Sequence, residues 1–231
     1  MKLNWMSPAC LLLSGLAASA AQGADYSATL SLTSDYRFRG ISQSAGDPAL
    51  QGSLDAAFDN GLFVGLWGSN IDFDDDADIE VDWYAGYGAE FSEQLSWDAT
   101  LYYYSYPGYD TDADYAELAL NLYYGDLTLG YVHASDYFNT GETSQYLALD
   151  YSYGLSEEVA LDLHAGYSFG DYWKELDIGD YRDFSVGVST TIATLDLSLA
   201  YLFNDVDDGM EVNGGAFAND DTLLLSVSRS F

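Results

Sequence analysis

Apolar and polar residues alternate along most of the chain with a period of two. Within residues 26–38, for example, Leu30 and Leu32 alternate with Ser31 and Thr33. This period places successive side chains on opposite faces of a strand, whereas a helix has a longer period. Twelve segments follow the pattern, and Gly, Asn and Asp separate them. The predicted strands are residues 26–38, 49–58, 62–72, 79–91, 95–106, 115–124, 127–135, 144–155, 159–169, 180–192, 195–204 and 221–231.

The connections between these segments alternate between short and long. The short ones are residues 59–61, 92–94, 125–126, 156–158 and 193–194. The long ones are residues 39–48, 73–78, 107–114, 136–143, 170–179 and 205–220. Tight turns at one end and long loops at the other are typical of outer-membrane barrels, and every segment has the ~9 to 11 residues needed to cross the hydrocarbon core. A soluble β-sandwich would use strands of ~5 to 6 residues. The sequence therefore predicts an all-β fold, a transmembrane antiparallel up-and-down β-barrel of twelve strands.

Aromatic residues lie near the ends of many predicted strands, where outer-membrane barrels carry girdles at the two lipid–water interfaces. They include Tyr26, Phe58, Phe63, Phe91, Trp97, Tyr151, Tyr153, Tyr201 and Phe203. The last segment places Leu223, Leu225 and Val227 on one face and ends at Phe231. This ending is similar to the C-terminal signal of outer-membrane barrels, so Phe231 is the candidate signal for the barrel-assembly machinery.

The first residues differ in character from the rest of the chain. Lys2 is followed by an apolar run over residues 10–18 and by small residues up to Gly23. This order predicts a signal peptide over residues 1–23, recognised by the secretion machinery, and a barrel domain over residues 24–231. Because the single cysteine, Cys10, lies inside the leader, the mature chain is expected to hold neither a disulfide nor a cysteine metal site.

The charge balance excludes one class of partner. The chain has 6 Lys and Arg against 38 Asp and Glu, which gives a formal net charge of −32. Nucleic acid would be repelled by this charge at long range. Strongly acidic chains are often disordered, but an aromatic content of 16% argues for an ordered fold.

The strongest motif follows the first predicted strand. Residues 33–44 read TSDYRFRGISQS, and residues 47–52 read DPALQG. In these residues, in Trp67-Gly68-Ser69-Asn70 and in the closing SVSRSF, the chain resembles the Gcw_chp family of proteobacterial outer-membrane proteins, the TorF-like porins. The resemblance implies a barrel in the Gram-negative outer membrane with a porin role. It supplies no catalytic residue.

The polar face of the strands carries the candidate functional residues. If the apolar face meets lipid, the polar face lines the lumen. The candidate lumen residues are Arg37, Arg39, Asp55, Glu80, Asp82, Glu90, Asp98, Glu117, Asp150, Asp162 and Asp196. Carboxylates repel anions, so we expect a passive channel for small cationic or neutral hydrophilic solutes, with the two arginines forming a constriction or pairing with the acids.

Three alternatives stay open at this point. First, the lumen charges pair with one another while bulky tyrosines fill the barrel, which makes it a structural barrel whose loops contact envelope components such as lipopolysaccharide. The inward tyrosines are Tyr84, Tyr102, Tyr104, Tyr106, Tyr123 and Tyr146. Second, His133 and Ser135 share a strand face, as in an outer-membrane lipid hydrolase, but no orienting residue is identifiable, so we expect no enzyme.

Third, an acidic loop could hold Ca²⁺. The cluster comprises Asp72, Asp74, Asp75, Asp76 and Asp78. Hard cations take several carboxylate oxygens, yet the spacing differs from that of a calcium loop. A solvated surface is therefore the favoured interpretation of this cluster, and no cofactor is expected.

Overall fold

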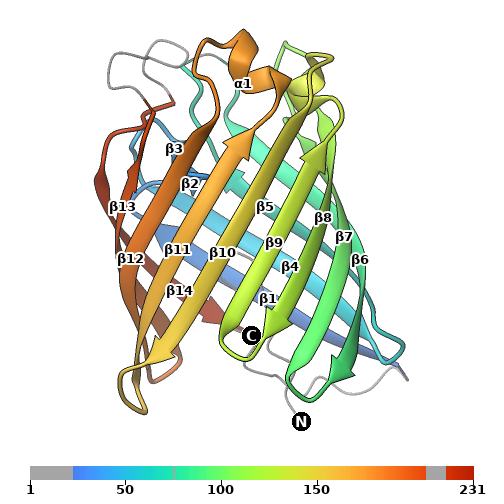
Figure 1. The fold of residues 1–231 in the computed structure, drawn as a ribbon, viewed down its shortest axis with the longest axis vertical. Coiled ribbons are helices and arrows are strands. Elements are labelled where there is room, and N and C mark those ends of the chain that lie inside the picture. The colour runs from blue at the N-terminus through green and yellow to red at the C-terminus, as the bar shows by residue number, and fades with distance from the viewer. Residues whose placement is uncertain (1–22, 75, 207–216) are drawn as a thin grey trace.

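The computed structural model describes residues 23–74, 76–206 and 217–231 (Figure 1). Its described part contains a closed barrel of twelve antiparallel strands, as the alternation predicted. The barrel strands are β1 (Ala24–Thr33), β4 (Ala49–Phe58), β5 (Leu62–Asn70), β6 (Ile79–Ser92), β7 (Leu95–Ser105), β8 (Tyr115–Tyr124), β9 (Leu127–Ala134), β10 (Ser144–Gly154), β11 (Val159–Phe169), β12 (Tyr181–Ile192), β13 (Leu195–Asn204) and β14 (Thr222–Ser230). The predicted signal peptide lies almost entirely in residues 1–22, outside the described residues, and stays a prediction.

Each barrel strand pairs with the next barrel strand along the chain, and β1 closes the barrel against β14. In that closing pair, Thr29 lies opposite Ser230 and Leu32 lies opposite Val227. Phe231 continues the closure, because its backbone N–H donates to the Ala28 carbonyl at 2.8 Å. The sheet thus has no open edge, which is what a β-structure needs in a solvent that cannot satisfy backbone groups.

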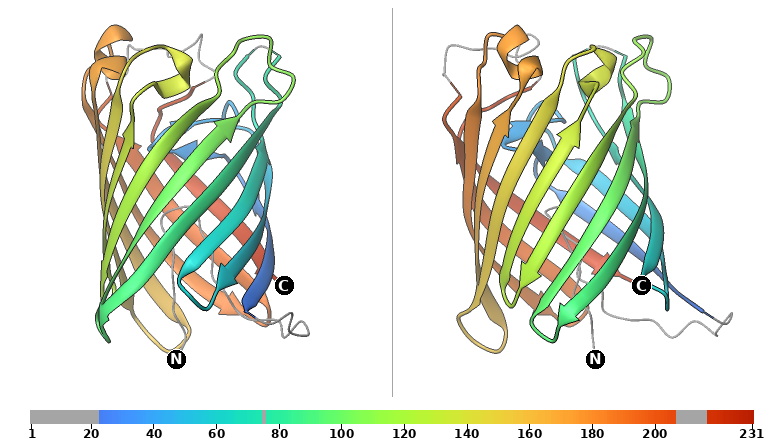
Figure 2. Two further views of the ribbon diagram at one scale, coloured as in Figure 1. Left: turned by 90° about the vertical axis from the view of Figure 1, so that its right-hand side faces the viewer. Right: turned by 45° about the vertical axis from the view of Figure 1, so that its right-hand side comes forward.

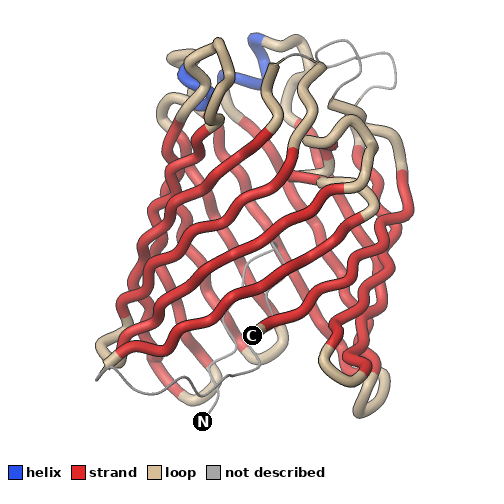
Figure 3. Tube along the Cα trace, turned by 180° about the vertical axis from the view of Figure 1, so that it is seen from behind, coloured by secondary structure: helices blue, strands red, loops and turns tan. Residues whose placement is uncertain are grey.

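The two ends of the barrel differ (Figures 1 and 3). Short turns join the strands at the end where the described chain begins and where the C-terminus lies, called here the turn end. Long connections gather at the opposite end, the loop end, where they carry the short helices η1 (Tyr137–Asn139) and α1 (Asp171–Glu175). Figure 2 shows the same arrangement from two further sides.

The outer wall is apolar along its whole circumference. Leu30, Leu54, Trp83 and Leu101 are 55 to 61% exposed although each lies within a strand. Exposed apolar surface on this scale is unusual on a protein surrounded by water, and it matches the lipid-facing band of membrane barrels. Within the described residues, no helix combines the length and apolarity required to cross a membrane.

One strand prediction needs a correction. The segment 26–38 was predicted as a single strand, but β1 ends at Thr33 and the chain then turns into the barrel. There β2 (Arg37–Phe38) and β3 (Ile41–Ser42) form a small hairpin, the inner hairpin. Its two central residues, Arg39 and Gly40, have φ values of 51° and 83°. Positive φ at both positions is the conformation of a tight two-residue hairpin turn, and it ends the extended run.

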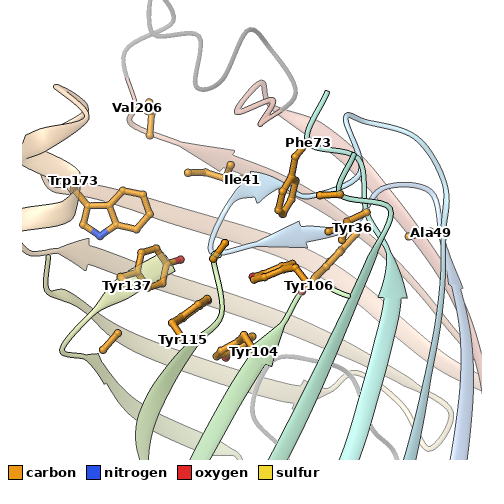
Figure 4. Close-up of a cluster of buried hydrophobic side chains, with 14 of the residues drawn as sticks. Tyr36, Ile41, Ala49, Phe73, Tyr104, Tyr106, Tyr115, Tyr137, Trp173 and Val206 are labelled. Atoms are coloured by element: carbon orange, nitrogen blue, oxygen red, sulfur yellow. The ribbon is translucent and has the colours of Figure 1, made fainter. Parts of the chain in front are cut away.

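Apolar side chains from the inner hairpin, the loops and the adjoining ends of the strands fill the loop end of the barrel (Figure 4). The cluster includes Tyr36, Ile41, Phe73, Tyr104, Tyr106, Tyr115, Tyr137, Trp173, Tyr181 and Val206, all less than a tenth exposed. Many of the rings are in contact, and those of Tyr104 and Tyr115 stack with centroids 4.5 Å apart. The molecule therefore has its packed core inside one end of the barrel.

Candidate functional site: the barrel lumen

Carboxylates from most of the wall strands occupy the inward positions. The alternation of burial places these side chains on the face opposite the exposed apolar residues. Glu80, Asp82, Asp98 and Glu117 are buried. Asp55, Asp150, Asp162 and Asp196 are half-buried, and Glu90 is exposed close to the turn end. Three of the four buried acids, Glu80, Asp82 and Glu117, lie toward the loop end, where the inner hairpin lies, and Asp98 lies nearer the turn end.

The inner hairpin is built around Asp35. This carboxylate accepts hydrogen bonds from Ser42 Oγ at 2.6 Å and from Ser44 Oγ at 3.2 Å, and it forms an ion pair with Arg37. Arg37 Nη1 also donates to the carbonyl of Ala218 at 2.9 Å. Arg37 therefore attaches the hairpin to the connection before β14, and its side chain is only 6% exposed.

Arg39, at the tip of the inner hairpin, reaches across to the opposite wall. Its Nη2 lies 2.6 Å from Glu117 Oε2 on β8, and its guanidinium carbon lies 4.8 Å from the centre of the Tyr146 ring on β10. Tyr181 Oη donates to the Arg39 carbonyl at 3.0 Å. Burial alone would lower the pKa of Arg39, but the charge of Glu117 beside it contributes to a pKa well above its ordinary value. The tip thus carries a fixed positive charge inside the barrel.

Gly40 permits this close approach to the wall. A Cβ on Gly40 would lie 2.7 Å from Asp183 Cβ, closer than two carbons can pack. The positive φ of Gly40 costs glycine nothing, whereas it would strain any side chain. Arg39 bears that strain itself, and its contacts to Glu117 and Tyr181 hold it in place.

Below the hairpin, toward the turn end, hydroxyl and amide groups satisfy the acids. Asp98 accepts from Tyr123 Oη at 2.6 Å, from Thr100 Oγ1 at 2.9 Å and from Asn121 Nδ2 at 3.2 Å. Asp55 on β4 accepts from Ser53 Oγ at 2.9 Å and from Tyr84 Oη. None of these contacts comes from a basic side chain.

A second cluster surrounds His164 on β11. Its Nδ1 lies 2.6 Å from Asp150 Oδ1 on β10, and its Nε2 lies 3.0 Å from Asp183 Oδ1 on β12. Tyr146 Oη lies 2.9 Å from the same Nε2. Asp183 is not among the candidates selected from the sequence, although it lies two residues after Tyr181 in the predicted strand and therefore on the same, inward face.

Of the described residues, few offset the lumen acids. Arg39 forms an ion pair with Glu117, and His164 lies between Asp150 and Asp183. Lys174 and Arg182 pair with Asp171 and Asp205 at the loop end, where both ion pairs are exposed. Acidic side chains therefore outnumber basic ones in the described lumen.

The candidates outside the lumen are placed as follows. Asp72, Asp74, Asp76 and Asp78 are exposed at the loop end, while Asp75 lies outside the described residues. In the described part of the chain, no three His, Cys, Asp or Glu side chains converge as metal ligands. His133 Nδ1 lies 3.3 Å from Gln145 Nε2. Ser135 follows the end of β9 and is no longer in the strand.

A closed antiparallel barrel with an apolar outer wall and a charged lumen defines the class of small outer-membrane-type barrels. Residues 17–231 match the model of a family described as "Bacterial protein of unknown function (Gcw_chp)", and the chain belongs to this family. No curated protein matches the chain. Among solved structures, it is similar to the KdgM porin, with a TM-score of 0.57 and 11% identity over 89% of this chain and 99% of that one. The NanC porin gives a TM-score of 0.56 and 12% identity over 87% of this chain and 98% of that one. These likenesses show a common fold.

Proposed function

We propose that the protein is a porin-type channel of the bacterial outer membrane that passes small cationic or neutral hydrophilic solutes. The observation that carries this proposal is the inward row of carboxylates in a closed barrel whose outer wall is apolar. The selectivity residues we propose are Asp55, Glu80, Asp82, Glu90, Asp98, Glu117, Asp150, Asp162 and Asp196, with Arg39 as their counterion and Arg37 as its support. The partners are membrane lipid, lipopolysaccharide and the solutes themselves.

The sign of the lumen charge decides between solute classes. One solved structure shows the KdgM porin in complex with disordered oligogalacturonate, a polyanion. In this chain, each ionised lumen carboxylate without a basic partner acts on a unit charge ~10 Å away with ~0.4 kcal/mol even at the dielectric constant of water, and with more where the walls exclude water. Several such groups along one path add up to a barrier against anions and an attraction for cations. An acidic oligosaccharide is therefore disfavoured as the solute.

Passage also requires the loop end to open. The inner hairpin and the aromatic cluster occupy that end in the described structure (Figure 4). The tip of the hairpin is joined to the wall through polar contacts, among them Arg39 with Glu117 and Tyr181 with the Arg39 carbonyl, while Ile41 and Phe38 pack in the aromatic cluster. The polar contacts can be exchanged for contacts to water or to a solute, so the tip of the hairpin is the element that we expect to move.

Planar-bilayer recording of the refolded barrel tests the proposal. We expect discrete conductance steps and a reversal potential in a KCl gradient that shows preference for K⁺. Replacing Asp55 and Asp162 by Asn should reduce the preference, whereas Asp112→Asn in an exposed loop should leave it nearly unchanged. Preference for Cl⁻ in the unmodified protein would contradict the role of the lumen acids.

A non-conducting envelope barrel is the second candidate. The filled loop end favours it, because a packed aromatic core stabilises the barrel without providing a path. A barrel of this type would show no conductance steps, either as the unmodified protein or after the tip of the inner hairpin is removed from the wall. Conductance steps that appear only after the tip is removed from the wall would instead identify a channel that is closed in the unmodified protein.

A further inference from the structure

The Arg39 guanidinium lies against the wall in the way that a ligand lies in its binding site. The guanidinium comes from the hairpin, but the groups around it come mainly from the wall: Glu117 from β8, and Tyr146 from β10. Phe38 from the hairpin covers the guanidinium, with the Arg39 carbon 4.5 Å from its ring centre. The side chains of Arg39 and Glu117 are 6% and 1% exposed. A carboxylate next to an aromatic face is the usual arrangement for binding a planar, weakly hydrated cation.

The site has unused binding capacity. Glu117 Oε2 takes both the Arg39 hydrogen bond and one from Tyr104 Oη at 3.0 Å. The second oxygen, Glu117 Oε1, is buried and has no hydrogen-bond partner. A buried carboxylate oxygen without a donor is costly, so a ligand that offers two parallel N–H donors would bind better than the single contact that Arg39 makes.

We propose that Glu117 and Tyr146 form a binding site for guanidinium or organic ammonium groups of solutes, and that Arg39 occupies this site as an internal ligand. The inference rests on the proposed function in one respect, since a solute reaches the site through the lumen. A solute with such a group competes with Arg39, releases the tip of the inner hairpin and so opens its own path. The aromatic face favours organic cations over metal ions, which matches the absence of a convergent metal-ligand set among the described side chains.

The covalent link between Arg39 and the inner hairpin explains why the closed arrangement prevails without a solute. An internal ligand on a short segment acts at an effective concentration of at least millimolar order. A free competitor must therefore exceed that concentration or bind through more contacts than Arg39 does. Removing the Arg39 side chain should empty the site and leave the wall groups available to a free cation.

The test is competition by free guanidinium in the refolded barrel. Guanidinium chloride should raise the open probability of the unmodified protein, because it displaces Arg39, and Arg39→Ala should raise it at least tenfold without guanidinium. In Arg39→Ala the tip is already released, so bound guanidinium only occupies the path and reduces the current, with a half-maximal effect at ~1 to 10 mM, because a ligand of this size has few contacts to make. NaCl at the same ionic strength serves as the control. In Arg39→Ala/Glu117→Gln, guanidinium should lose at least tenfold in potency.

Isothermal titration calorimetry of guanidinium with the detergent-solubilised Arg39→Ala barrel separates the two proposals. Binding without conductance in any variant would refute the channel and retain the site. Conductance of Arg39→Ala with neither binding nor block by guanidinium would refute the site and retain the channel. Heat-modifiable gel mobility verifies folding, and Arg39→Gln, which removes the charge but keeps a longer polar side chain, replaces Arg39→Ala if that variant does not fold. Guanidinium that acts equally on the Glu117→Gln double variant would also overturn the site.

Discussion

Leu163→Arg tests the assignment of the two faces of the barrel wall. Leu163 lies within β11, is 37% exposed on the outer face, and is paired with Tyr151 on β10 and Val186 on β12. An arginine there has apolar neighbours on both adjacent strands and lipid in front. Charged residues on the lipid-facing side near the bilayer midplane cost ~2 to 4 kcal/mol. The folding equilibrium should therefore shift by ~30- to 900-fold toward the unfolded state, at 1.36 kcal/mol per tenfold.

The matched control is the next residue, on the inner face. Asp162 is half-buried, and its Oδ1 accepts a hydrogen bond from Ser152 Oγ at 2.7 Å. Asp162→Asn keeps an acceptor oxygen in place, so the loss should stay within ~1 kcal/mol. Urea titrations of barrels folded into phospholipid vesicles, followed by tryptophan fluorescence, give both values. Equal losses at positions 162 and 163, or none at 163, would mean that lipid does not cover the face we assign to it.

Two further predictions concern glycines that face close neighbours. Gly40→Ala should displace the tip of the inner hairpin and increase conductance, because the new Cβ would meet Asp183. The control is Gly46→Ala, which is also at positive φ but has no atom within 4 Å of the new Cβ, and it should leave conductance unchanged. Gly166→Ala should destabilise the barrel by ~1 to 3 kcal/mol in the same urea titration, because its Cβ would lie 2.1 Å from the buried Tyr146 hydroxyl. Unchanged stability in Gly166→Ala would show that Tyr146 can move aside.

The barrel itself could be predicted from sequence because its determinants are local. Alternation within each strand fixes which side chains face outward, and the lengths of the connections fix the order of turns and loops. Closure between β1 and β14 follows because lipid offers no partner to the backbone groups of an open edge. The inward position of Asp98 and Glu117 follows from this alternation alone.

The inner hairpin could not be predicted from the same signal. Tyr36 and Phe38 continue the alternation of β1, so the pattern alone extends that strand. What ends it is the turn at Arg39-Gly40, whose partners are remote: Glu117 is 78 residues and Tyr181 is 142 residues away in sequence. An arginine followed by a glycine can also lie within a strand, so these two residues alone do not predict a turn. The sequence placed Tyr104 and Tyr106 of the aromatic cluster inside the barrel, but it did not give the partners that the loops add, such as Phe73 and Trp173.

The two arginines of the motif illustrate how tertiary contacts change the meaning of a sequence pattern. Two residues apart in an extended strand, Arg37 and Arg39 would both point into the lumen and add to one field. In the structure, Arg37 attaches the hairpin to the connection before β14, whereas Arg39 neutralises Glu117 on the far wall. The positive charge that offsets Glu117 thus belongs to the hairpin and not to the wall. In the channel that we propose, moving the hairpin exposes a path and, in the same step, makes that path more acidic, so opening and preference for cations are coupled.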